Sequence, residues 1–295
     1  MNALTRDHLT ALLEAFFVTF LWSSSYVLVK VGLQQLTPLS LVALRYLTAT
    51  VVLAVIAFRR GEMAFTLDRR NLVKTGVLGV SGYTIAQGLQ CIGLFYLPAV
   101  SVTFILNFTP VIVLVLGVLV LGESPRPLQL GGMGLVLLGA YLYFNKPLSE
   151  FNVVGVLITL VSGLGWAVYL ILSRYLFLNE RVSPLELTFS SMSMGTLILV
   201  LSALAVESLP SVSPMGWAII LWLGVVNTAL AFFLWNHALQ RLEAFEISVL
   251  QNTMLAQIAL LAWFFLGEQL TGTKILAMAL VFLGALVVQL RGQGA

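Results

Sequence analysis

The chain has 295 residues, of which 60% are hydrophobic and 9% are charged. Its mean hydropathy is +1.02, whereas about a quarter of the residues in an average soluble protein are charged. This composition excludes an ordinary soluble domain and predicts an all-α integral membrane protein.

Ten apolar stretches follow one another along the chain, and several of the short connections between them carry proline, glycine, asparagine or serine. Most stretches approach or exceed the roughly 20 residues that a helix needs to cross about 30 Å of hydrocarbon. The predicted transmembrane helices are residues 9–31, 38–58, 72–96, 98–121, 128–145, 152–177, 184–206, 215–239, 244–266 and 272–290. Little of the chain remains for a soluble domain.

The distribution of lysine and arginine predicts the orientation in the membrane. Ten spans place both termini on one side, and a cytoplasmic position for them gathers most basic residues inside, as is usual in membrane proteins. The cytoplasmic segments then hold Arg6, Arg59, Arg60, Arg69, Arg70, Lys74, Arg126, Arg174, Arg181, Arg241 and Arg291, and the outer segments hold Lys30, Lys146 and Lys274. We interpret the net charge of +3 as a topology signal and do not expect nucleic-acid binding.

The two halves of the sequence resemble each other at an offset of 145 residues. At this offset, 19 of the 65 residues at positions 76–140 are identical to their counterparts, roughly three times what this composition alone would give. Asn107 falls on Asn252 in this comparison. The sequence therefore predicts two copies of one structural unit.

Each copy would contain five helices, and this odd number has a structural consequence. Because five spans end on the side opposite to the one on which they began, the second copy must enter the membrane in the inverted direction. Residues 1–147 and 148–295 are thus predicted to be inverted five-helix repeats around a central cavity, an arrangement common among secondary transporters.

Two further features point to a family. The first helix of each half contains a tryptophan and ends in a basic residue, Lys30 or Arg174, and the fourth helix of each half closes with Gly-Glu, at Glu123 and Glu268. Together with the repeat, these residues resemble the drug/metabolite transporter superfamily, specifically its EamA-type members. The sequence is most similar to YddG-type exporters of aromatic and other neutral amino acids. This resemblance implies export of such metabolites across a bacterial inner membrane.

Two asparagines lie at equivalent depth in the fourth and ninth spans. Asn107 and Asn252 either line the cavity or form interhelical hydrogen bonds, which are worth about 0.6 kcal/mol on average in membranes. Pro110 removes a backbone donor and is expected to kink the fourth span. The second half has Leu255 at that position, so we expect the two halves to differ there.

A polar stripe marks the third span. Tyr83, Gln87 and Gln90 follow one another at i, i+4 and i+7, which places them on one face of a helix. The eighth span offers Asn227, Thr228 and Trp235. Such residues line a route for substrate or join two helices, because polar groups avoid lipid.

Aromatic residues of the first and sixth spans complete the candidate cavity. Trp22 and Tyr26 share one face of the first helix, and Trp166 and Tyr169 lie at corresponding depth in the sixth. For Trp235 of the eighth span, packing or a place in an aromatic belt at the membrane interface is the alternative interpretation.

Charged side chains near the span ends are predicted to act in gating or in holding helices together. Lys30 and Arg174 could reach the lipid headgroups or form ion pairs, and Glu123 and Glu268 could cap helices. Arg45 lies about two turns inside the second span, where we expect a partner such as a backbone carbonyl, because an unpartnered charge is costly there.

Missing motifs narrow the mechanism. The sequence contains no GxxxxGK[ST] phosphate loop and no HExxH or GxSxG motif, and two histidines and one cysteine argue against a metal site. We therefore predict no enzymatic activity, cofactor or metal, and hypothesise a secondary transporter that exports neutral or zwitterionic metabolites by alternating access, with an amino acid and the lipid bilayer as its partners. A nucleotide-sugar or drug transporter of the same superfamily, a channel-like facilitator and a membrane scaffold are the alternatives. The oligomeric state is left open, and a monomer is compatible with the sequence.

Overall fold

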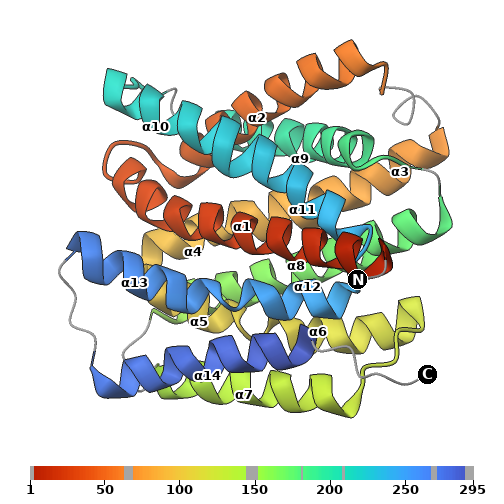
Figure 1. Ribbon diagram of the computed structural model, residues 1–295. Coiled ribbons are helices and arrows are strands. Elements are labelled where there is room, and N and C mark those ends of the chain that lie inside the picture. Colours follow the sequence, from red (N-terminus) through yellow and green to blue (C-terminus); the bar gives the residue numbers. More distant parts are fainter. Residues whose placement is uncertain are drawn as a thin grey trace.

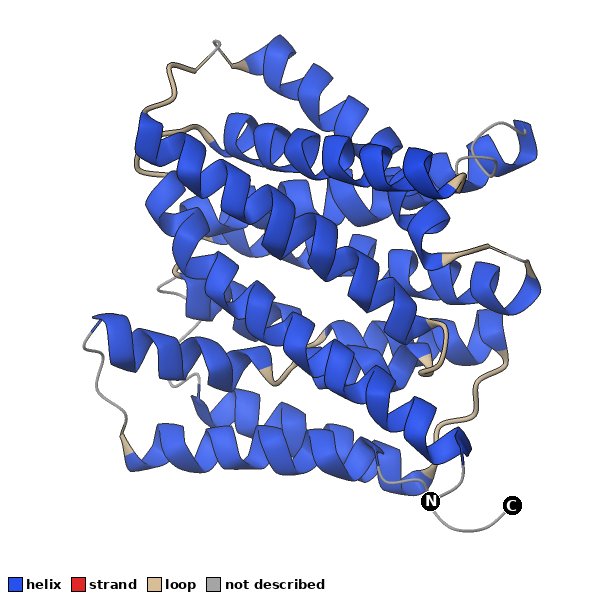
Figure 2. Cartoon of the chain, turned by 45° about the horizontal axis from the view of Figure 1, so that its top comes forward, coloured by secondary structure: helices blue, strands red, loops and turns tan. Residues whose placement is uncertain are grey.

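The computed structural model describes residues 3–62, 69–143, 152–180, 182–207, 210–266 and 271–289. Within these ranges every regular element is a helix (Figure 2), so the predicted all-α class is confirmed. Nine described helical segments are long and apolar enough to cross a membrane, and Pro127–Tyr143 is a shorter apolar helix. These ten segments agree with the predicted spans of a multi-pass membrane protein.

Several spans consist of more than one helical segment. The elements in chain order are α1 (Ala3–Gly32), α2 (Pro38–Arg60), α3 (Arg69–Leu78), η2 (Gly79–Gly88), α4 (Leu89–Tyr96), α5 (Ala99–Leu106), α6 (Thr109–Leu116), η3 (Gly117–Leu121), α7 (Pro127–Tyr143), α8 (Val153–Asn179), α9 (Pro184–Val206), α10 (Pro214–Gly224), η5 (Val225–Leu230), α11 (Ala231–Leu239), α12 (Ala244–Gln251), α13 (Met254–Leu266) and α14 (Gly272–Gln289).

The spans form one bundle in which α1 and α8 occupy the middle (Figure 1). Helix α1 packs on α11 and α13, α8 packs on η2, α4 and α6, and α2 packs on α9. The start of α1 and the end of α14 lie at the same end of the bundle, as an even number of spans requires. We call this the Arg174 end and the opposite one, where α1 ends, the Lys30 end.

Side-chain caps fix the beginnings of three spans at the edges of the bundle. Asn152 accepts a hydrogen bond from the amide of Gly155 at the start of α8, and Ser213 accepts one from Gly216 at the start of α10. Ser183 begins α9 with a capping box, in which Glu186 bonds back to the Ser183 amide. These bonds satisfy amides that the first turn of a helix leaves without partners.

The third and eighth spans each contain a π-helical stretch, η2 and η5. η2 begins at Gly79, and η5 begins at Val225. Val225 directly follows Gly224, which is the counterpart of Gly79 at the offset of 145 residues. In η2 the backbone closely approaches α9, since a Cβ atom on Gly79 would lie 2.6 Å from the carbonyl oxygen of Ser191. A π-helical turn shifts the side chains that follow it around the helix axis, and such turns are frequent at functional sites.

The fourth and ninth spans are both interrupted in mid-membrane. Helix α5 ends at Leu106 and α6 begins at Thr109, while α12 ends at Gln251 and α13 begins at Met254. Both interruptions lie at the asparagines singled out above, and the second one occurs without a proline. The difference expected between the halves at Pro110 and Leu255 therefore does not extend to the break, which both spans have.

Helices α7 and α14 form an outer pair that approaches closely through small residues. A Cβ atom on Gly132 would lie 2.7 Å from the carbonyl oxygen of Gly284, and one on Gly139 would lie 2.7 Å from that of Ala277. Small residues at such crossings allow two helix backbones to touch in a membrane. The pair lies at the edge of the bundle, away from α1 and α8 (Figure 1).

Candidate functional site

A small polar cavity lies between α1, α2, the third span and the break in the ninth span. Its volume is about 30 Å³, which is enough for about one water molecule. The residues that line it are Trp22, Ser25, Tyr26, Val29, Leu41, Val42, Arg45, Gln87, Gln90, Cys91, Leu94, Gln251 and Met254. Four of them, Trp22, Tyr26, Gln87 and Gln90, belong to the cavity residues predicted from the sequence, and Arg45 was predicted to act in gating or in holding helices together.

The polar groups of the cavity come from glutamines and a tyrosine. Gln90 donates a hydrogen bond to the hydroxyl of Tyr26, which joins the third span to α1. On the opposite wall the amide oxygen of Gln251 accepts a bond of 2.7 Å from Nε1 of Trp166. Amide groups can both donate and accept hydrogen bonds, so this wall suits a neutral or zwitterionic solute.

Arg45 is the one basic residue in the cavity wall, and only 7% of it is exposed. Its Nε donates to the hydroxyl of Thr228 at 2.6 Å, and Nη2 donates to the carbonyl oxygen of Asn227 at 3.2 Å. Both acceptors lie in η5, where the π-helical turn brings them to α2. The carbonyl partner expected for this buried charge is therefore present, together with a hydroxyl.

Aromatic rings fill the centre of the bundle next to the cavity. The ring of Trp22 lies 4.7 Å from that of Trp235, 5.3 Å from Phe232 and 5.6 Å from Trp166. Towards the Arg174 end the ring of Trp166 stacks on Tyr169 at 5.1 Å. This cluster packs between the cavity and the Arg174 end.

A second polar cluster lies beyond these rings. The hydroxyls of Tyr83 and Tyr169 are 3.0 Å apart, and Asn236 donates to Tyr169 at 2.7 Å and to the hydroxyl of Thr188 at 2.9 Å. Tyr83, Tyr169 and Asn236 are fully buried. Their side chains bond to one another, which leaves them packed between α8, α9 and α11.

The other eight predicted cavity residues all lie in packed regions outside the cavity wall. These residues are Tyr83, Asn107, Trp166, Tyr169, Asn227, Thr228, Trp235 and Asn252. One physical reason is a difference between the halves: at the offset of 145, Gln87 falls on Phe232 and Gln90 falls on Trp235. Two large, fully buried rings thus stand at the sequence positions that correspond to two amides of the cavity wall.

The two asparagines bond to each other across the bundle. Nδ2 of Asn252 donates to the carbonyl oxygen of Asn107 at 3.0 Å, while Nδ2 of Asn107 is buried without a hydrogen-bond partner among the described residues. This contact joins the breaks of the fourth and ninth spans. Asn252 lies directly after Gln251 of the cavity wall, so the break is adjacent to the cavity.

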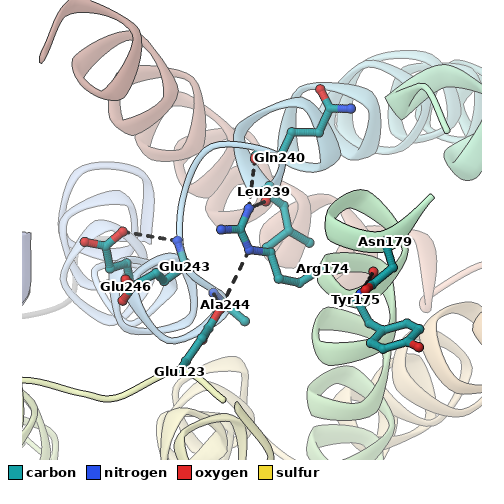
Figure 3. Close-up of polar contacts among 9 residues, drawn as sticks. All are labelled: Glu123, Arg174, Tyr175, Asn179, Leu239, Gln240, Glu243, Ala244 and Glu246. Carbon is teal, nitrogen blue, oxygen red and sulfur yellow. Dashed lines mark hydrogen bonds and ion pairs between the residues drawn. The ribbon is translucent and has the colours of Figure 1, made fainter. Parts of the chain in front are cut away.

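The basic residues at the two ends of the bundle make similar contacts. Lys30 donates to the carbonyl oxygens of Leu94 and Leu97, the latter at 2.8 Å. Arg174 donates through Nη1 to the carbonyl oxygens of Leu239 at 2.9 Å and Gln240 at 2.8 Å (Figure 3). Each cation therefore binds the end of a neighbouring span, where unpaired carbonyls accumulate.

Glu123 connects the first half of the chain to the second at the Arg174 end (Figure 3). Its Oε1 lies 3.7 Å from Nε of Arg174 and accepts a hydrogen bond of 3.3 Å from the amide of Ala244, at the start of α12. Gly122 adopts a left-handed conformation with φ of 67°, which suits glycine and turns the chain out of η3. Burial of the carboxylate raises the pKa of Glu123.

The corresponding Glu268 lies outside the described residues, so its predicted role stays a prediction. Eight residues line the cavity without having been predicted from the sequence: Ser25, Val29, Leu41, Val42, Cys91, Leu94, Gln251 and Met254. Gln251 could have been found as the neighbour of the repeated asparagine. Nothing in the sequence pattern distinguishes the other seven from packing residues.

Comparison with known proteins identifies the kind of molecule to which this cavity belongs. The EamA-like transporter family matches the chain twice, over residues 9–145 and 153–290. The chain belongs to the EamA-like transporter family. It is therefore a membrane transport protein and not an enzyme, and the predicted resemblance is confirmed.

Similar proteins of other organisms agree with this assignment. A probable amino-acid metabolite efflux pump of Salmonella typhimurium is 27% identical over 288 residues, covering 92% of this chain and 91% of the relative. The Escherichia coli protein of the same description is 26% identical over equal shares. An uncharacterized transporter of Archaeoglobus fulgidus is 27% identical over 263 residues, covering 84% of this chain and 86% of the relative.

A solved crystal structure shares the fold of this EamA-like transporter. The two superpose with a TM-score of 0.80 at 20% sequence identity, over 95% of this chain and 97% of the other. At this identity the likeness supports the helical architecture alone.

Proposed function

We propose that this EamA-like transporter exports neutral or zwitterionic amino acids, with aromatic and other apolar side chains preferred, by alternating access through the cavity. The observation that carries the proposal is the composition of the cavity wall. Amides from Gln87, Gln90 and Gln251 line the cavity together with Trp22 and Arg45, and none of the described residues in its wall is acidic. Polar and aromatic groups of this kind suit a solute that has both a polar backbone and an apolar side chain.

The size of the cavity supports a transporter that changes conformation. At about 30 Å³ it is smaller than any amino acid, so binding requires the surrounding helices to move apart. The breaks at Asn107 and Asn252 and the π-helical turns of the third and eighth spans are suitable places for such movement, because the regular helix hydrogen bonding is interrupted there. We infer that these segments move between states open at the Lys30 end and at the Arg174 end.

The proposed arrangement has two inverted repeats, residues 1–147 and 148–295. The double match of the family supports this division, and so do the equivalent contacts of Lys30 and Arg174. We further propose that the Arg174 end and both termini face the bacterial cytoplasm, because most arginines then lie on the inner side.

A proteoliposome experiment tests the function. Purified protein is reconstituted into liposomes, and radiolabelled phenylalanine or threonine is loaded inside. Its efflux is compared with that from liposomes that contain the label but no protein. We expect efflux that accelerates when unlabelled amino acid is present outside, because a transporter returns faster when loaded. Efflux no faster than from empty liposomes would refute the substrate assignment, and efflux without this acceleration would favour a channel.

Running the same assay with a pH gradient of either direction tests energy coupling. Accumulation against a concentration gradient requires a second, downhill ion. Equal efflux with and without the gradient would identify a uniporter or exchanger of amino acids. A flux that follows the gradient would identify proton coupling.

A further inference from the structure

We infer that Arg45 binds the carboxylate of the substrate and that the cavity provides no ionic partner for an amino group. The transporter would then accept carboxylates with an apolar side chain, whether or not they carry the amine. The inference rests on the proposed function, since it concerns the same cavity. It narrows the substrate to molecules that have one carboxylate.

The guanidinium is held in a fixed orientation. Thr228 and the carbonyl of Asn227 accept from Nε and Nη2, and the ring of Tyr46 lies 5.5 Å from Cζ. Nη1 makes no hydrogen bond with any described residue, although Arg45 is almost completely buried in the cavity wall. A donor held in place and left without a partner is suited to bind an oxygen atom of a ligand.

The charge of this guanidinium is also uncompensated. Among the described residues, none of the ion pairs involves Arg45, and the thirteen residues of the cavity wall include no aspartate or glutamate. A charge at this depth is costly unless an opposite charge or several acceptors are present. A carboxylate of the substrate would supply the missing negative charge.

The partly buried cations Lys30 and Arg174 show that this arrangement is particular to Arg45. Lys30 does not line the cavity itself and binds the carbonyl oxygens of Leu94 and Leu97, and Arg174 binds two carbonyls and faces Glu123. When Pro38 is aligned with Pro184, Arg45 falls on Ser191. The second half therefore has no counterpart of this cation.

An amino group would meet weaker and less specific partners. Amide oxygens of the glutamines and the face of Trp22 can contact an ammonium group, but the same amides can equally bond to a hydroxyl or a keto group. Recognition of the amine should therefore contribute less than recognition of the carboxylate. An amine without a carboxylate would bring a second positive charge next to Arg45 and be repelled.

Competition binding at pH 7 tests this inference. Purified protein binds radiolabelled phenylalanine, which is displaced by unlabelled phenylalanine, 3-phenylpropanoate or phenethylamine. The last two have the same ring, and each lacks one charged group. We expect the affinity of 3-phenylpropanoate to lie within about 10-fold of that of phenylalanine. Phenethylamine should compete about 10- to 100-fold more weakly than 3-phenylpropanoate, as the loss of a charge-assisted hydrogen bond implies.

Two variants at Arg45 separate recognition from folding. Arg45→Gln keeps an amide donor but removes the charge, and it should weaken phenylalanine binding about 10- to 100-fold. It should also abolish the preference for 3-phenylpropanoate over phenethylamine, which is measured from the thermal shift that each analogue produces. Arg45→Lys keeps the charge and should keep the order of the analogues. Lys30→Gln removes a cation at the same end of the bundle, outside the cavity wall, and should also keep that order.

The outcomes distinguish this inference from the proposed function. Equal competition by phenethylamine and 3-phenylpropanoate in the unaltered protein, or an unchanged preference in folded Arg45→Gln, would overturn the role of Arg45. If the protein binds no phenylalanine, the proposed function fails, and labelled 3-phenylpropanoate then tests the inference directly. Binding of that ligand that is lost in Arg45→Gln and retained in Arg45→Lys would still support it, and no binding would refute it.

Discussion

Replacement of one glycine at the contact between α7 and α14 should destabilise the protein without altering the cavity. In Gly132→Ala, the added Cβ atom would lie 2.7 Å from the carbonyl oxygen of Gly284 and 3.0 Å from the amide nitrogen of Val288. Both are backbone atoms of a helix, which cannot rotate away. Gly134→Ala is a matched control two residues further along α7, because a Cβ atom there meets no neighbouring atom within 4 Å.

The magnitude follows from the required displacement. An ordinary contact begins at about 3.4 Å, so the two helices must separate locally by about 0.7 Å. Overpacking of this kind costs about 1–3 kcal/mol. Alanine favours a helix over glycine by up to about 1 kcal/mol, and both variants gain this amount. Gly132→Ala should therefore be about 1–3 kcal/mol less stable than Gly134→Ala.

Thermal unfolding of the purified protein in detergent measures this difference. At about 2–4 °C per kcal/mol for a chain of this size class, we expect the Tm of Gly132→Ala to lie roughly 2 to 12 °C below that of Gly134→Ala at one heating rate. Amino-acid flux per folded molecule should remain close to that of the unaltered protein. Equal Tm values for the two variants would refute the close approach of α7 and α14.

Three further predictions concern other contacts. Burial opposes ionisation of Glu207, but hydrogen bonds from Thr37 and from the amides at the start of α2 outweigh this effect and lower the pKa of Glu207. The stabilising effect of its carboxylate should be present above about pH 4.5 and fade as the pH falls further. The Tm difference between the unaltered protein and Glu207→Gln should therefore shrink in acid, and a difference that grows would contradict this sign. Asn252→Ala removes one interhelical hydrogen bond and should lower the free energy of unfolding by only about 0.6 kcal/mol. The amino-acid flux should decrease, and an unchanged flux would show that the bond serves packing alone. Glu123→Gln removes the negative charge facing Arg174, a pair worth about 1 kcal/mol. In a protein that carries Cys91→Ser and a reporter cysteine at the Arg174 end, Leu239→Cys, this change should make the reporter react roughly fivefold faster with a thiol reagent. An unchanged rate would exclude Glu123 from holding this end closed.

The sequence alone was sufficient for the class of protein and for several contacts. Apolar composition and span length required a helical membrane protein, because only helices and closed barrels satisfy backbone groups in lipid. The offset of 145 residues singled out Asn107 and Asn252, and the structure joins them by a hydrogen bond. Arg45 could be expected to have a buried acceptor, because a charge at its depth requires one.

The tertiary structure alone decided which polar residues meet in a cavity. Tyr83 shares a helical stripe with Gln87 and Gln90, yet it packs against Tyr169 while the glutamines line the cavity. The π-helical stretch that contains Tyr83 and Gln87 is one physical reason, since it rotates side chains away from the positions that a regular helical period predicts.

The break in the ninth span is a second case. Its sequence has no proline, and a helix period gives no sign of an interruption between Gln251 and Met254. Side chains of neighbouring helices determine whether a broken backbone is stabilised, and those contacts are absent from a one-dimensional pattern. The sequence thus determined that polar residues lie in the bundle. Tertiary packing decided that Gln87 and Gln90 line the cavity while Phe232 and Trp235 pack against Trp22, because these neighbours come from spans far apart in the chain.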